Sequence, residues 1–143
     1  LVMGLPVMGE GNSFLARMMA SLESGKQVVF PENEIRTTVD VITLGRAFLE
    51  LAALDCTGIV HLAGNTRLNR YEMAQHIACR LGLPEELVTA TNSNSMPGRA
   101  KRPNDASLDN SKAKMLLTTH MRTLDEALDL VLQVKKEQQD GIS

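Results

Sequence analysis

Aromatic residues, long apolar runs and net charge are scarce in this sequence, and each scarcity excludes a class of protein. There is no Trp, and no apolar run approaches the roughly 20 residues that cross a bilayer. The first eight residues lack the basic start and apolar middle of a signal peptide. A formal net charge of −2 creates no general field that would attract nucleic acid or an anionic membrane. We therefore expect no membrane and no nucleic acid among its partners.

Metal-binding residue patterns are also missing. Cys56 and Cys79 form neither a C-x-x-C pair nor a metal-ligand spacing, which favours ordinary buried thiols in a reducing, cytoplasmic compartment. His76 and His120 have no second ligand at a suitable spacing, so we expect no metal. His61 lies in an apolar stretch, where a single histidine is typical of a structural hydrogen bond rather than of catalysis.

The pattern that is present alternates strands and helices, which predicts an α/β fold in one domain of 143 residues. The expected strands span residues 1–5, 27–30, 35–39 and 59–62, and residues 87–90 and 106–108 are expected to be extended. The expected helices span residues 13–24, 41–51, 69–81, 110–117 and a final one from 123, with a helical turn at 84–86. Helix N-caps are predicted at Asn12 or Ser13, Asp40, Asn69 with Glu72, Asp109 or Asn110, and Thr123 with Glu126.

Two features favour a piece of a larger fold. Three or four short strands are few for a free-standing sheet, and residues 1–5 resemble a strand that is already under way. The wide apolar face of the first helix, which includes Phe14, Met18 and Leu22, needs a cover. We therefore expect the isolated chain to dimerise, exchange elements or aggregate through this face.

A glycine-rich loop at residues 4–11 is the first candidate site. It is neither G-x-G-x-x-G nor a P-loop, because Glu10 stands where a lysine should follow Gly9. One interpretation is a simple turn from strand to helix. The alternative is that backbone N–H groups near Asn12 and Ser13 meet a substrate phosphate at the start of the helix.

Basic residues make the second candidate site. Arg99, Lys101 and Arg102 lie together, and no aromatic residue between 96 and 114 would stack on a nucleic-acid base. The cluster is either a solvated surface patch or an anion clamp in which the planar guanidinium of Arg102 grips a phosphate. Arg36, which precedes a strand, has the same two interpretations.

Several short motifs occur in the order found in the dTDP-4-dehydrorhamnose reductase family of extended short-chain dehydrogenases/reductases. They are R-T-T-V-D at residues 36–40, H-L-A-G at 61–64, Y-E-M-A at 71–74, K-R-P at 101–103, L-D-N-S-K at 108–112 and T-L-D-E-A-L at 123–128. The sequence resembles this family over nearly its whole length. The regulatory β subunit of methionine adenosyltransferase shares similar segments, so the resemblance also fits a non-catalytic module.

The resemblance implies the C-terminal part of a Rossmann-like extended short-chain reductase, with few short strands and five or six helices. It implies a nucleotide-sugar ligand whose diphosphate is held by Arg102, with Arg36, Lys101, Asn12 and Ser13 as further contacts. The family's dinucleotide fingerprint is not in these residues. Its Y-x-x-x-K pair is also missing, because Gln75 stands where Tyr71 would need its lysine. NAD(P) is therefore expected to bind mainly to an N-terminal portion absent from this sequence, and this chain alone is expected to be inactive.

Three functions remain open at this point. They are the substrate-binding part of a sugar-nucleotide reductase, a regulatory or binding module with the same fold, and a nucleotide-sugar epimerase. A homodimer, or association with the missing N-terminal part, is the expected assembly.

Overall fold

The computed structural model describes residues 1–6, 13–95, 97–98 and 100–140. Within them the helices are α1 (Phe14–Glu23), α2 (Val41–Ala52), α3 (Arg70–Leu81), α4 (Ser111–Leu116) and α5 (Leu124–Asp140), with short 3₁₀ turns η1 (Glu85–Leu87) and η2 (Ser93–Ser95). The strands are β1 (Val2–Met3), β2 (Val28–Pro31), β3 (Ile35–Thr37), β4 (Val39–Asp40), β5 (Arg67–Asn69) and β6 (Val88–Thr91). The predicted α/β class with few short strands and five or six helices is confirmed.

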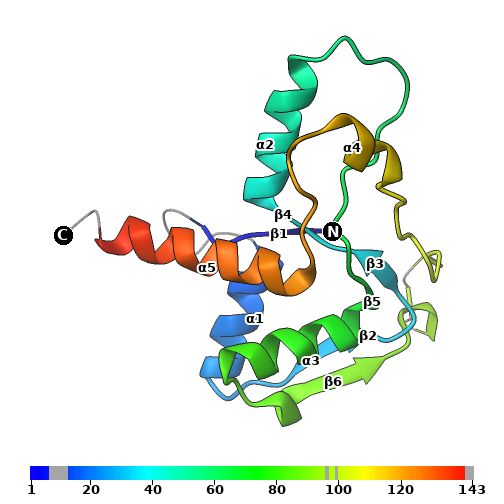
Figure 1. Ribbon diagram of the computed structural model, residues 1–143. Coiled ribbons are helices and arrows are strands. Elements are labelled where there is room, and N and C mark those ends of the chain that lie inside the picture. The colour runs from blue at the N-terminus through cyan, green and yellow to red at the C-terminus, as the bar shows by residue number, and fades with distance from the viewer. Residues whose placement is uncertain (7–12, 96, 99, 141–143) are drawn as a thin grey trace.

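The strands form three separate pairs (Figure 1). β1 pairs with β4 and β2 with β6, both in parallel, whereas β3 and β5 run antiparallel with Ile35 opposite Asn69. Ile35 also bridges to Asp105, which brings the segment after residue 100 against the edge of β3. The antiparallel pair therefore joins residues 30 to 34 positions apart in the sequence, and the bridge joins residues 70 positions apart.

The main core lies among α1, α3 and α5. Met18 and Leu22 of α1 are only 2% and 1% exposed, and they belong to the same buried cluster as Ile77 of α3 and Leu128 of α5. The prediction that the apolar face of α1 lacks a cover is therefore wrong. The chain covers this face itself, because α3 and α5 each present an apolar stripe to the same core.

Helix ends follow the predicted capping chemistry. Asp40 Oδ1 accepts from Thr43 N at 2.7 Å, and Asn69 and Glu72 form a complete capping box. Thr123 and Glu126 form the same reciprocal pair at the start of α5. Of the two candidates before α4, Asp109 is the residue whose carboxylate accepts from Ser111 N, at 2.9 Å.

Asn110 has a different role. Its side chain donates to Ala63 O at 2.7 Å and to Asn65 Oδ1 at 2.9 Å, so it ties α4 to the segment before β5.

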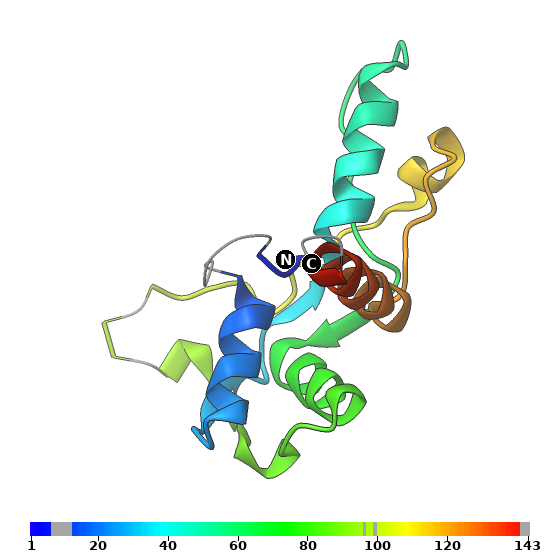
Figure 2. The same ribbon diagram turned by 90° about the vertical axis from the view of Figure 1, so that its left-hand side faces the viewer.

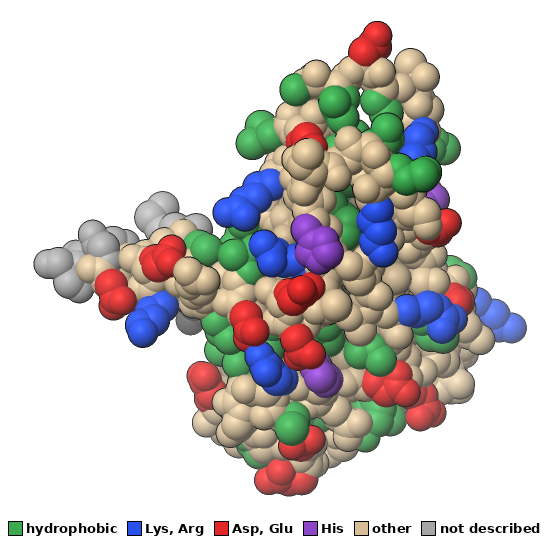
Figure 3. All heavy atoms as spheres, viewed as in Figure 1, with side chains coloured by type: hydrophobic (Ala, Val, Ile, Leu, Met, Phe, Trp, Pro, Cys, Tyr) green, Lys and Arg blue, Asp and Glu red, His purple; other side chains and the backbone are tan. Residues whose placement is uncertain are grey.

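The outer face of α2 is apolar and exposed. Phe48 is 57% exposed and Leu49 is 76% exposed. Thr43 and Ala47 face inward instead. Figures 1 and 2 both show α2 extending away from α1 and α3, with α4 beside it. In Figure 3 hydrophobic side chains gather on the surface of this same end of the molecule.

Residues 59–62 form no strand within the described part of the chain, contrary to the prediction. Lys112 Nζ donates to the carbonyl groups of Thr57 and Ile59, at 3.3 and 3.1 Å. Val60 packs on a small second core around Ala47, whereas the side chain of Ile59 is 79% exposed. A sequence suited to a strand forms one only where another strand lies beside it, and here Lys112 bonds the carbonyl group of Ile59 instead.

None of the described helices is both long enough and apolar enough to cross a membrane.

Candidate functional site

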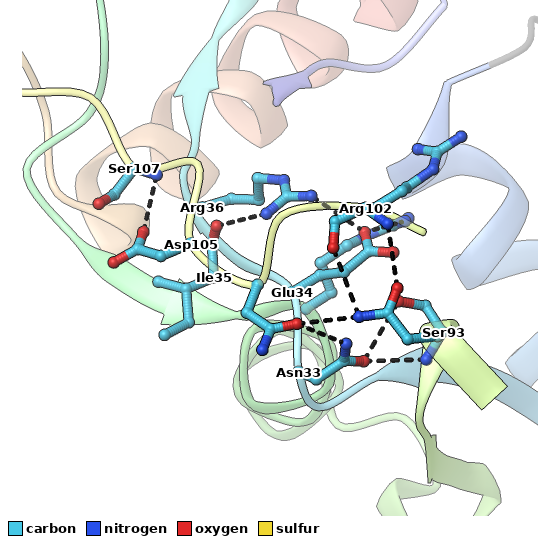
Figure 4. A network of polar contacts seen from close by, with 11 residues as sticks. Asn33, Glu34, Ile35, Arg36, Ser93, Arg102, Asp105 and Ser107 are labelled. Carbon is cyan, nitrogen blue, oxygen red and sulfur yellow. Dashed lines mark hydrogen bonds and ion pairs between the residues drawn. The ribbon is translucent and has the colours of Figure 1, made fainter. Parts of the chain in front are cut away.

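A network of three asparagines supports the segment that carries Arg102. Asn104 Oδ1 accepts from the side chains of Asn33 and Asn94, both at 3.1 Å. Asn33 Oδ1 in turn accepts from Ser93 N at 2.9 Å. Figure 4 shows these amides between the turn after β2 and the start of η2. The segment between β6 and residue 104 is therefore held at both ends, and Ser93 is buried.

Arg102 lies at the edge of this network. Its backbone N donates to Asn94 Oδ1 at 3.0 Å, and its backbone O accepts from Asn94 Nδ2 at 3.4 Å. Its side chain is exposed and, in Figure 4, points out of the network. Lys101 is exposed beside it. A fixed backbone with a free-standing guanidinium is an arrangement that suits capture of an anion from solvent.

Arg36 belongs to a separate ion-pair network with Glu34 and Arg70. Its guanidinium contacts Glu34 Oε2 at 3.2 Å and donates to Ile35 O at 2.6 Å. Glu34 is 1% exposed, and Arg70 NH1 also approaches Glu34 Oε2, at 3.6 Å. The sequence drew attention to Arg36 but missed Glu34 and Arg70, which share its ion-pair network.

Asp105, three positions after Arg102, has an arginine partner of its own. It pairs with Arg67, and its Oδ1 accepts from Ser107 N at 2.9 Å. The bonds from Arg67 and Ser107 hold the pKa of Asp105 well below its usual range. The carboxylate thus fastens residues 105–107 to β5, and Arg102 and Asp105 make contacts with different parts of the fold.

A pocket of about 230 Å³ lies between α1 and β2 and has an aromatic and cationic lining. The rings of Phe14 and Phe30 meet edge to face, with centroids 5.3 Å apart. The guanidinium carbon of Arg70 lies 6.0 and 5.9 Å from these two centroids. Arg17 also lines the pocket, so two cations and two aromatic rings border the cavity.

The beginning of α1 lies close to this pocket, since Phe14 is its first residue. Ser13 Oγ accepts from Ala16 N at 3.0 Å and thereby caps the helix, as predicted. Asn12 and Arg99 lie outside the described residues. Among the described residues there is also no cluster of three or more His, Cys, Asp or Glu side chains that would hold a metal ion.

Most of this sequence matches the sequence model of one protein family. The model described as "RmlD substrate binding domain" matches residues 6–137. This chain belongs to that family. The comparison with curated proteins found no match.

Solved structures share the fold. A dTDP-4-dehydrorhamnose reductase from Bacillus anthracis in complex with NADP aligns with a TM-score of 0.76 and 15% identity, over 92% of this chain and 45% of that chain. A hypothetical dTDP-4-dehydrorhamnose reductase from Sulfolobus tokodaii aligns with a TM-score of 0.67 and 32% identity, over 87% of this chain and 44% of that one.

A solved structure of an enzyme with another activity shares the fold as well. UDP-glucuronic acid 4-epimerase from Bacillus cereus in complex with NAD aligns with a TM-score of 0.63 and 15% identity, over 98% and 42% of the two chains. The chain therefore spans less than half the length of these solved structures.

Proposed function

We propose that this chain is the substrate-binding part of an NAD(P)-dependent sugar-nucleotide reductase similar to dTDP-4-dehydrorhamnose reductase. Membership of the substrate-binding family and the exposed side chain of Arg102 support this proposal. Under it, residues 1–143 comprise the substrate-binding part and the last strands of a dinucleotide-binding sheet. The portion that binds most of the dinucleotide lies outside this sequence.

The diphosphate of the nucleotide sugar binds to Arg102 in this proposal, with Lys101 beside it. One observation carries the assignment: Asn94 fixes the backbone of Arg102 through two hydrogen bonds, while the guanidinium stays exposed. Arg102 thus offers its planar fork of N–H donors without a conformational search of its backbone. Arg36 adds positive charge from its own ion-pair network, and Asn12 and Ser13 contribute at the start of α1.

The base of the nucleotide binds in the pocket next to Phe14 and Phe30. A planar ring stacks well on aromatic side chains and on an arginine, and this pocket offers both. Arg17 and Arg70 at its border also favour a ligand that carries phosphates.

Nicotinamide chemistry belongs to residues outside this sequence. NAD(P) supplies or accepts the hydride in such enzymes, and a positioned acid delivers the proton. This chain has no G-x-G-x-x-G and no Y-x-x-x-K, so its residues do not fit that cofactor. The part played by the residues described here is to bind and orient the nucleotide sugar.

Arginine substitutions test the proposal. Arg102→Ala should weaken the affinity for a dTDP-sugar at least tenfold, and Arg102→Lys should recover part of the loss because it keeps the charge but not the fork. Lys26→Ala, which removes a charge from the loop after α1, serves as the matched control. An unchanged affinity in Arg102→Ala would show that Arg102 does not bind the diphosphate.

An epimerase is the second candidate, because UDP-glucuronic acid 4-epimerase shares the fold. The two activities differ in their use of the cofactor. Net oxidation of NAD(P)H by the whole protein supports the reductase, whereas turnover of a nucleotide sugar without net oxidation supports the epimerase.

A further inference from the structure

Glu34 is a buried acid that contacts two arginines of the proposed site, Arg36 and Arg70. Its side chain is 1% exposed, in the turn between β2 and β3. Burial of a carboxylate is strongly unfavourable unless cations and donors surround it. Two guanidinium groups approach the same oxygen, Glu34 Oε2: that of Arg36 at 3.2 Å and that of Arg70 at 3.6 Å.

The backbone strengthens this connection to Arg70. Arg70 N donates to Glu34 O at 3.1 Å, next to the β3–β5 pair in which Ile35 lies opposite Asn69. Glu34 and Arg70 are therefore adjacent through both backbone and side chain, although they are 36 positions apart. The first residue of α3 is thus fixed against the turn before β3.

Arg70 connects the buried acid to the pocket. Its guanidinium lies about 6 Å from the ring centroids of both Phe14 and Phe30, and it lines the 230 Å³ cavity, whereas Glu34 does not line it. A long arginine side chain loses considerable conformational freedom when it is held in one position. A carboxylate that holds it before the ligand arrives removes this cost from binding.

We propose that Glu34 is a positioning residue that holds the guanidinium of Arg70 against Phe14 and Phe30 at the wall of the nucleotide pocket. This inference rests on the proposed function in its choice of ligand. Glu34 also keeps two arginines together that would otherwise repel each other, so its single negative charge organises a site of net positive charge.

Other roles for Glu34 predict different results. If it served only as an unfavourable negative charge near the ligand, its neutralisation would raise the affinity for a nucleotide diphosphate. If it served only to stabilise the fold, its neutralisation would lower the melting temperature and leave the affinity of the folded protein unchanged. A positioning role predicts a weaker affinity and a displaced Arg70.

The first experiment observes Arg70 without a ligand. Two nearby aromatic rings should shift the NMR signals of the Arg70 side chain upfield through their ring currents. In Glu34→Gln this shift should disappear, while in the matched control Glu72→Gln, which removes a charge from the exposed start of α3, it should remain. A ring-current shift that persists in folded Glu34→Gln would overturn the positioning role.

The second experiment measures the affinity for dTDP by calorimetry. We expect Glu34→Gln and Arg70→Ala each to weaken binding about tenfold, and the double variant to bind no more weakly than either, since both changes remove the same held guanidinium. A hundredfold loss in the double variant, or tighter binding in Glu34→Gln, would overturn the inference. If Glu34→Gln does not fold, Glu34→Asp should show smaller changes of the same sign in both experiments, and an unaltered Arg70 there would overturn the inference as well.

The two proposals fail separately. If the wild-type chain binds dTDP and Arg102→Ala weakens it, but Glu34→Gln leaves both the ring-current shift and the affinity unchanged, only the role of Glu34 is wrong. If the wild-type chain binds no dTDP, the proposed function fails, and the purpose assigned to Glu34 fails with it.

Discussion

The side-chain amide of Asn94 bonds to both backbone polar groups of Arg102. Its Oδ1 accepts from Arg102 N at 3.0 Å, and its Nδ2 donates to Arg102 O at 3.4 Å. These two bonds hold the residue of the proposed clamp in one backbone orientation. The geometry of the clamp therefore depends on a neutral amide eight positions upstream.

Asn94→Ala should weaken the binding of dTDP about fivefold. The loss of a net hydrogen bond corresponds to about 1 kcal/mol, and here it loosens the backbone that presents Arg102. Calorimetric titration measures the change. Ser24→Ala, which also removes an exposed side-chain hydrogen bond but at the end of α1, is the control. Equal affinities in the wild type and Asn94→Ala would show that the loop needs no such support.

Asp40→Ala should destabilise the fold by about 1–2 kcal/mol, because it removes the cap of α2. The Asp40 side chain is completely buried, and its Oδ1 bonds to Thr43 N. Asp40→Asn should cost much less, since asparagine caps helices almost as well. Urea unfolding of the two variants checks this order. An Asn variant as unstable as the Ala variant would mean that the charge of Asp40, rather than its cap, stabilises the helix.

Acid should break a second stabilising contact of α2, the hydrogen bonds of Glu50 with Thr118 and Thr119. Hydrogen bonds from Thr119 and Thr118 lower the pKa of Glu50 from 4.5 to about 2. A carboxylate with a lowered pKa in the folded state adds stability above its unfolded pKa, and this stability is lost as the pH falls from about 4.5 to about 2.

Glu50→Gln should therefore melt at a lower temperature than the wild type at pH 7, and the difference should shrink as the pH falls through that range. Glu86→Gln, an exposed acid in η1, provides the comparison. A gap between Glu50→Gln and the wild type that stays constant down to pH 2 would contradict the connection.

The exposed face of α2 should cause self-association of the 143-residue chain. Phe48 and Leu49 lie on this face, and a β-carbon added at Gly45 would meet no atom within 4 Å. A glycine inside a helix makes the helix less stable, but it leaves room for another element to approach the backbone closely. An exposed apolar face with such a glycine is typical of an interaction surface.

Leu49→Asp should reduce association in light scattering, while Val29→Asp, an exposed apolar position on β2, should not. A wild-type chain that stays monomeric at high concentration would contradict this expectation.

Local chemistry explains what the sequence could predict. The caps at Ser13, Asp40 and Asn69 were predictable because a cap needs only a short polar side chain and an N–H group three positions on. Asp109 and Asn110 were both plausible caps, and only the tertiary contact of Asn110 with Ala63 separates their roles.

Contacts between distant positions explain what the sequence could not predict. Glu34 and Arg36 are two positions apart, so a strand pattern places them on the same side, but nothing local points from Glu34 to Arg70. The strand expected at residues 59–62 failed for a related reason, since its residues are suitable but the described chain supplies no neighbour. The exposed face of α2 has the pattern of a buried helix, and periodicity alone does not reveal what covers it.

The most direct test of the central claim is a titration of the wild-type chain with dTDP and with thymidine at low and high salt. The account predicts that dTDP binds clearly more tightly than thymidine, that salt weakens dTDP more than thymidine, and that Arg102→Ala removes most of this difference. Equal affinities for dTDP and thymidine at both salt concentrations would contradict the account, because a site without preference for the diphosphate is not the substrate site of a sugar-nucleotide enzyme.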